Sequence, residues 1–92
     1  MTFTYPAIFR QREDGSYEAR FIDLDDCTAT GDNLDLCIRD AIEAARSWIQ
    51  VELEEEVPLL PPVTHIEDVV PEEGEIVRNI GVIVRMMDGY DE

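Results

Sequence analysis

Residues 31–53, GDNLDLCIRDAIEAARSWIQVEL, form the longest periodic stretch of the chain and decide its fold. Apolar side chains recur there at steps of three and four, so they share one face of a predicted helix. These residues are Leu34, Ile38, Ala41, Ile42, Ala45, Trp48, Ile49 and Leu53. Asn33 or Asp32 can cap the helix start, and Gly31 frees the turn that enters it. A helix with such a face must pack against a surface that the other residues supply.

The residues before the helix predict a hairpin. Residues 2–12 alternate between two faces, as in a half-buried strand, and Pro6 then belongs near the strand start, at an edge or at a bulge. Asp14-Gly15 follows, and Asp-Gly between two alternating runs is a strong hairpin signal. Tyr17–Ile22 is therefore predicted to be a second strand, antiparallel to the first.

Two more strands are predicted on either side of the helix. After the loop Asp23–Asp26, the short β-prone segment Cys27–Thr30 predicts a third strand. Residues 57–74 contain a proline-rich run and predict an extended connector, with a short turn near His65–Val70. Glu75–Arg85 predicts a fourth strand, whose second half is apolar on both faces and is expected in the sheet interior or at a dimer contact. Residues 86–92 are expected to fray.

The predicted order is thus β-β-β-α-β, in one domain that spans residues 1–92. This order is typical of an α+β fold, with a mixed, mainly antiparallel sheet and one long helix packed on one face.

The charge balance restricts the partners. Twenty-two acidic residues face seven basic ones, all arginines, for a net charge of −15. Such a field repels phosphate backbones, which argues against direct nucleic-acid binding, and it accelerates encounter with a basic protein. Solubility, or the general composition of the source organism's proteins, would explain the acidity equally well. The candidate partner-binding residues are Asp23, Asp25, Asp26, Glu54, Glu55 and Glu56, and the alternative is a solvated loop and a solvated helix end.

Signals for catalysis are weak. Carboxylate sites with two metal ions need acids that converge from different strands, whereas Asp23, Asp25 and Asp26 share one loop. We therefore expect no enzymatic activity, no cofactor and no metal site. His65, the one histidine, is interpreted as a surface residue, and Trp48 as a core or dimer contact rather than a partner hot spot.

The remaining features indicate the compartment. Cys27 and Cys37 lie ten residues apart without a CxxC pairing, as expected of reduced, half-buried thiols in a cytosolic protein. The chain has neither a signal-peptide pattern nor an apolar run long enough to span a bilayer. A cytoplasmic location is the expectation.

Taken together, these residues resemble a known family. YPAIF at 5–9, EDGSYEARFIDLDDC at 13–27 and GDNLDLCIRDAIEAA at 31–45 closely resemble the HicB-like antitoxin pattern. That pattern runs from Tyr-Pro through Asp-Gly-x-Tyr and a Phe-x-Asp-Leu loop ending in cysteine to the amphipathic helix. The segment from Pro61-Pro62 to IEDVVPEEGEIVRNIGVIV, at 66–84, resembles the connector and final strand of the family.

The resemblance implies a truncated ribonuclease-H-like domain that neutralises HicA, a small basic toxin that cleaves messenger RNA. Many relatives carry a DNA-binding domain after the last strand. This sequence ends seven residues after Arg85, so the form without that domain is expected. Other relatives are solitary, which leaves a self-associating structural or regulatory module as the alternative. A homodimer or higher homo-oligomer is expected in either case.

Overall fold

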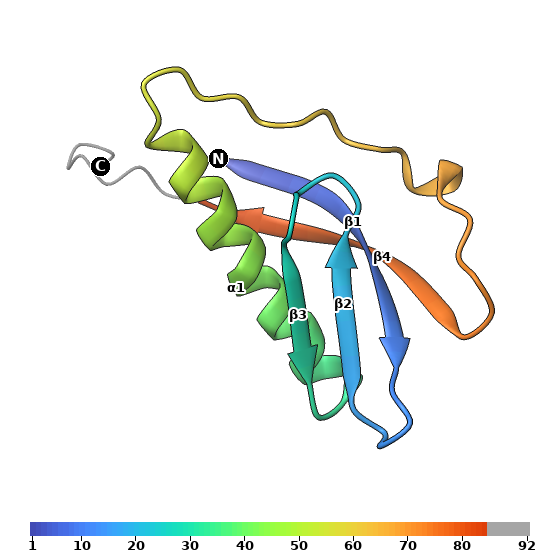
Figure 1. The fold of residues 1–92 in the computed structure, drawn as a ribbon. Helices are drawn as coiled ribbons and strands as arrows, with labels where there is room; N and C mark the ends of the chain where they lie inside the picture. The colour runs from blue at the N-terminus through green and yellow to red at the C-terminus, as the bar shows by residue number, and fades with distance from the viewer. Residues whose placement is uncertain (85–92) are drawn as a thin grey trace.

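The computed structural model describes residues 1–84, which form one sheet and one long helix (Figure 1). The strands are β1 (Thr2–Gln11), β2 (Tyr17–Phe21), β3 (Thr28–Gly31) and β4 (Glu75–Ile83), and the helices are α1 (Leu34–Leu53) and the short 3₁₀ helix η1 (Ile66–Asp68). The predicted order and the α+β class are confirmed. The end of the predicted last strand, Arg85, and the predicted tail, 86–92, lie outside the described residues.

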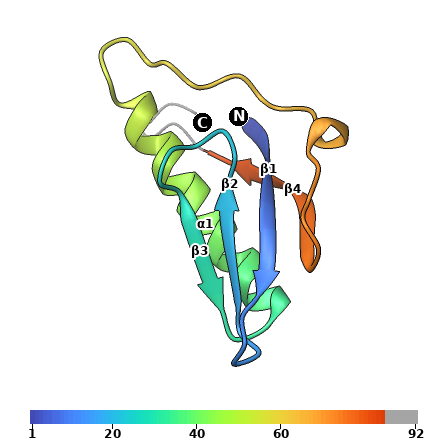
Figure 2. The same ribbon diagram turned by 45° about the vertical axis from the view of Figure 1, so that its right-hand side comes forward.

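The sheet has the order β3-β2-β1-β4, and its three pairings are all antiparallel. The prediction of a mixed sheet is corrected in this respect. Helix α1 returns the chain to the end of the sheet where β1 begins, and a strand that started there would run parallel to β1. Residues 54–74 instead carry the chain to the other end, so that Glu75 pairs with Arg10 and Ile83 with Thr2 (Figures 1 and 2).

Helix α1 covers one face of the sheet, and the core lies between them (Figure 1). The side chain of Asn33 caps the helix by accepting a hydrogen bond from the Leu36 N–H at 2.9 Å. The fully buried stripe of the helix is Cys37, Ala41, Ala45 and Ile49. The larger residues of the predicted face, including Ile38, Ile42 and Trp48, flank this stripe and are half-buried against the core.

Both cysteines are free and fully buried, rather than half-buried as predicted. Burial raises the pKa of the Cys27 thiol to about 11. It also raises the pKa of Cys37, and the nearby Asp40 carboxylate contributes to that shift. Both thiols are therefore protonated at neutral pH and are poor nucleophiles.

The sheet interior is occupied by β1 and β2, whereas β3 and β4 form the edges. Of the two positions predicted for the last strand, the sheet interior is therefore wrong within the described chain, and the dimer contact stays a prediction. Pro6 lies in β1, and the pairing of β1 with β2 starts only at Ala7. Proline is tolerated there because β2 has already ended where the missing N–H would bond.

Candidate partner-binding site

The predicted acidic loop, Asp23–Asp26, joins β2 to β3 and has two different parts. Asp23 is half-buried and holds the connector: its carboxylate oxygens accept hydrogen bonds from the Thr64 N–H at 2.9 Å and the Thr64 hydroxyl at 2.6 Å. Asp25 and Asp26 are exposed. Asp26 has a φ of 59°, a left-handed conformation that aspartate tolerates better than most residues. Only the last two aspartates thus offer open carboxylates to a partner.

Trp48 ties this loop to the helix. Its indole Nε1 donates a hydrogen bond to the Asp25 carbonyl at 3.0 Å, while the ring packs against the core. The predicted core role of Trp48 agrees with this packing. Trp48 also lines an open groove between β3 and α1, with a volume of about 460 Å³.

The groove has an apolar floor and acidic sides. Its lining residues are Asp26, Cys27, Thr28, Ala44, Ser47, Trp48, Val51 and Glu52. Val51 is 61% exposed, although it lies on the longest helix of the fold. An exposed apolar residue of this size, which lines the same groove as Asp26 and Glu52, is typical of a surface that receives a partner with both apolar and basic groups.

The other predicted acidic set begins where α1 ends. Glu54 caps the helix, Glu54, Glu55 and Glu56 are exposed, and the last turn contains no basic residue. Glu54 follows Trp48 by six residues, or about 9 Å along the helix axis. The two predicted sets therefore lie near the same end of α1, although Glu54, Glu55 and Glu56 do not line the groove itself. We call Asp25, Asp26, Glu52, Glu54, Glu55 and Glu56, with Trp48 and Val51 between them, the acidic end.

Carboxylates close to the C-terminus of a helix face its negative dipole end, an arrangement that costs stability. Four of them follow one another here within residues 52–56, and one is used internally: the Glu52 carboxylate accepts a hydrogen bond from the Leu59 N–H at 3.2 Å. The fold gains nothing evident from the other three, which is consistent with a role in binding.

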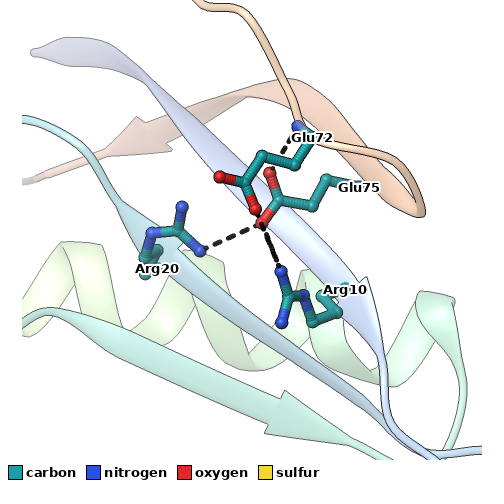
Figure 3. A network of polar contacts seen from close by, with 4 residues as sticks. All are labelled: Arg10, Arg20, Glu72 and Glu75. Atoms are coloured by element: carbon teal, nitrogen blue, oxygen red, sulfur yellow. Dashed lines mark hydrogen bonds and ion pairs between the residues drawn. The ribbon is translucent and has the colours of Figure 1, made fainter.

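Three of the seven arginines lie on the opposite face of the sheet, which α1 leaves open. Arg10, Arg12 and Arg20 line a hollow of about 300 Å³ there, together with Ile8, Glu18, Thr28 and Thr30. The Glu75 side chain is 2% exposed and receives Arg10 Nη2 at 3.2 Å and Arg20 Nη1 at 3.4 Å (Figure 3). The Glu72 N–H donates to the same carboxylate at 2.9 Å, and with the two arginines it lowers the pKa of Glu75.

This network fastens the start of β4 to β1 and β2, and Arg12 pairs with Glu18 at 3.1 Å. The positive charge of the hollow is therefore largely balanced within the chain. The sequence analysis did not single out these residues. The available signal was the alternation that puts Arg10 and Arg12 on one face of a strand.

Two further observations concern metal binding and membrane spans. Within residues 1–84, no group of three His, Cys, Asp or Glu side chains is arranged to hold a metal ion, and His65 is exposed at the start of η1. The helices described in residues 1–84 include none with the length and apolarity needed to cross a bilayer.

Comparison with known proteins gives a fold likeness. No family model and no curated protein matches the sequence. A chain of the "HicA3 and HicB3 toxin-antitoxin complex" is similar, with a TM-score of 0.67 and 22% identity over 91% of this chain and 100% of that one. A chain of a toxin–antitoxin complex from Streptococcus pneumoniae is similar with a TM-score of 0.71 and 20% identity, over 100% of this chain and 79% of that one. The fold is thus one found in toxin–antitoxin complexes.

Proposed function

We propose that this chain is a HicB-like antitoxin, which neutralises a small basic HicA-type toxin in the cytoplasm by covering its messenger-RNA-cleaving site. The observation that carries the proposal is the fold shared with two toxin–antitoxin complexes over at least 91% of this chain. The motif pattern of residues 5–84 supports the HicB-like assignment and the truncated ribonuclease-H-like domain that comes with it.

The charge distribution favours the antitoxin over the toxin as the role of this chain. A ribonuclease must attract a polyanion, but this protein has a net charge of −15. Its open-face arginines Arg10 and Arg20 already share the Glu75 carboxylate. We infer that the chain is a binding protein without enzymatic activity of its own.

The acidic end is the surface that best suits a basic partner. Asp25, Asp26 and Glu54–Glu56 supply a field that steers a cation toward the groove. Trp48 and Val51 then offer apolar area, which gives affinity once the partner is in place. Asp23 contributes indirectly, because it holds Thr64 and thereby the loop.

The proposal is tested by mixing the purified chain with the product of the small basic reading frame next to its gene. We expect a complex in size-exclusion chromatography at low salt and loss of the toxin's RNA cleavage. Trp48 is the only tryptophan, so its fluorescence emission reports contact at the groove. Failure to form a complex at low salt would overturn the proposal.

Charge-neutral variants test the surface. The triple variant Glu54→Gln, Glu55→Gln, Glu56→Gln should bind the toxin about tenfold more weakly, mainly through slower association. The control, Glu67→Gln, Asp68→Asn, Glu73→Gln, removes the same charge from exposed positions of the connector. With both variants measured at 0.1 M salt, the control should change affinity by less than about twofold, since fields fade there over a Debye length of about 10 Å. Equal losses in both variants would show that net charge matters and the acidic end does not.

A second candidate function is a solitary module that self-associates without a toxin. The specific observation in its favour is the edge strand β4, which is long and carries the exposed residue Ile83.

A further inference from the structure

The two edges of the sheet are built differently. Strand β3 has four residues and lies against α1. The outward Thr30 N–H donates a hydrogen bond to the Asp40 carboxylate at 3.0 Å, so the helix closes this edge. Strand β4 has nine residues and no comparable cover. Long unprotected edges tend to pair with another strand.

The hydrogen bonds at the end of β4 identify the groups that face outward. Met1 and Val84 exchange both backbone bonds, at 3.0 Å and 2.8 Å. Bonded and non-bonded pairs alternate in an antiparallel ladder, so the even-numbered residues of β4 bond to β1. The N–H and C=O groups of Val77, Asn79 and Gly81 consequently point away from the sheet.

Only the two ends of this edge are occupied. Arg46 Nε donates to the Ile83 carbonyl at 3.3 Å, and the Glu75 N–H donates to the Glu72 carbonyl at 3.0 Å. Within residues 1–84, the outward groups of Val77, Asn79 and Gly81 make no hydrogen bond to another part of the chain. These three residues form the open edge of β4.

The composition of the edge does nothing to prevent pairing. Residues 76–83, IVRNIGVI, contain neither lysine nor proline, and Arg78 is their only charge. Ile76 and Ile83 are 36% and 59% exposed. In a chain with a net charge of −15, this is a stretch where a second copy meets no negative charge.

We propose that a second copy of this chain pairs with the open edge, β4 against β4, in antiparallel fashion about a twofold axis at Asn79. This pairing joins two four-stranded sheets into one of eight strands. Each copy then places Val77 opposite Gly81 of the other, where the absence of a side chain leaves room for it. Three pairs exchange about two hydrogen bonds each.

The pairing leaves the acidic end free. Its groove borders β3, at the opposite edge of the sheet from β4. Self-association therefore does not depend on the proposed toxin, and a dimer would still be found if toxin binding failed.

The oligomeric state of the whole chain tests the proposal. Light scattering at micromolar concentrations should give twice the chain mass of 10.5 kDa. Asn79→Pro removes an outward N–H without breaking the ladder with β1, and it should halve the measured mass. The matched control is Thr28→Pro on β3, whose N–H also faces away from the sheet, and this variant should stay dimeric. A wild-type chain at 10.5 kDa, or a dimeric Asn79→Pro variant, would overturn the proposal.

Amide hydrogen exchange tests the pairing on the wild-type chain, so its result does not depend on whether a proline variant folds. In the dimer, the amides of Val77, Asn79 and Gly81 should exchange slowly, like those of Arg78 and Ile80 that bond to β1. Dilution to the monomer should accelerate the first group alone. Fast exchange of these three amides at high protein concentration would contradict the pairing.

Discussion

At the scale of single residues, Gly31 is important to the fold because it has no side chain. It lies where β3 passes into the helix, and a Cβ added there would be 2.3 Å from the Cys37 backbone N and 2.6 Å from the Leu36 carbonyl carbon. Both atoms belong to the first turns of α1 and cannot move independently. Gly31 is thus required for close approach of two backbones, and not only for a flexible turn as the sequence suggests.

Gly31→Ala should lower the free energy of unfolding by about 2–3 kcal/mol, the cost of overpacking a rigid site. Urea denaturation followed by circular dichroism measures this. Gly81→Ala, measured at a dilution at which the chain is monomeric, is the control, because its added Cβ meets only the Thr4 hydroxyl at 3.9 Å within the chain. Similar stability of the two variants would show that the helix start can shift to accept a side chain.

At the scale of elements, the connector of residues 54–74 determines where β4 enters the sheet. It contains no strand and only the short helix η1, yet specific contacts hold it. The Tyr5 hydroxyl donates to the Pro61 carbonyl at 2.8 Å, the Thr64 N–H donates to Asp23, and Leu60 packs against the core. Burial, and secondly the Asp23 charge, raise the pKa of Tyr5.

Asp23→Asn should therefore have two effects. The weaker bonds to Thr64 should cost about 1–2 kcal/mol of unfolding free energy. The pKa of Tyr5 should fall toward, but not reach, its ordinary value of 10.0, because burial remains. Absorbance titration of the tyrosines measures the second effect.

The sign of the pH dependence follows from the raised pKa. Protonated Tyr5 favours the folded state, so its contribution is complete below pH 10.0 and is lost as pH rises through the folded-state pKa. In Asp23→Asn this loss should still begin near pH 10.0, but it should be smaller and be complete at a lower pH, because the folded-state pKa is lower. Asp26→Asn is the matched control, because it removes a charge from the same loop without touching Thr64. A Tyr5 pKa unchanged by Asp23→Asn would contradict the assigned coupling.

These elements also show what the sequence could predict. Helix α1 and the first hairpin follow from local signals, the spacing of Ile38, Ala41 and Ile49 and the Asp-Gly turn. The direction and edge position of β4 depend on the path of a connector without periodicity, so no local pattern specifies them. The acidic residues were found from composition. The sequence could not predict that the two acidic sets lie near the same end of α1, because the Asp25–Trp48 hydrogen bond that joins the loop to the helix connects residues 23 positions apart.

At the scale of the whole molecule, the charge is distributed unevenly. The described ion pairs use Arg10, Arg12, Arg20 and Arg46, and three of these lie on the open face of the sheet. Among residues 1–84, no arginine forms an ion pair with a carboxylate of the acidic end, and these carboxylates repel one another. Folding brings them closer together than they are in the extended chain, and this repulsion opposes the compact state.

Added salt should therefore stabilise this protein, whereas it weakens the surface ion pairs of many others. Raising sodium chloride from low concentration to about 1 M shortens the Debye length to about 3 Å and screens most of the repulsion. We expect the free energy of unfolding to rise by on the order of 1 kcal/mol, since charges 10 Å apart in water interact by about 0.4 kcal/mol per pair. Urea denaturation at several sodium chloride concentrations measures the slope of the free energy of unfolding against salt concentration.

Neutralising Glu54, Glu55 and Glu56 changes the net charge from −15 to −12 and should reduce this slope. Sucrose, which carries no charge, should stabilise the wild-type chain and the triple variant alike. A slope that is unchanged in the triple variant would attribute the stabilisation to apolar burial, and the acidic end would then be well solvated rather than strained.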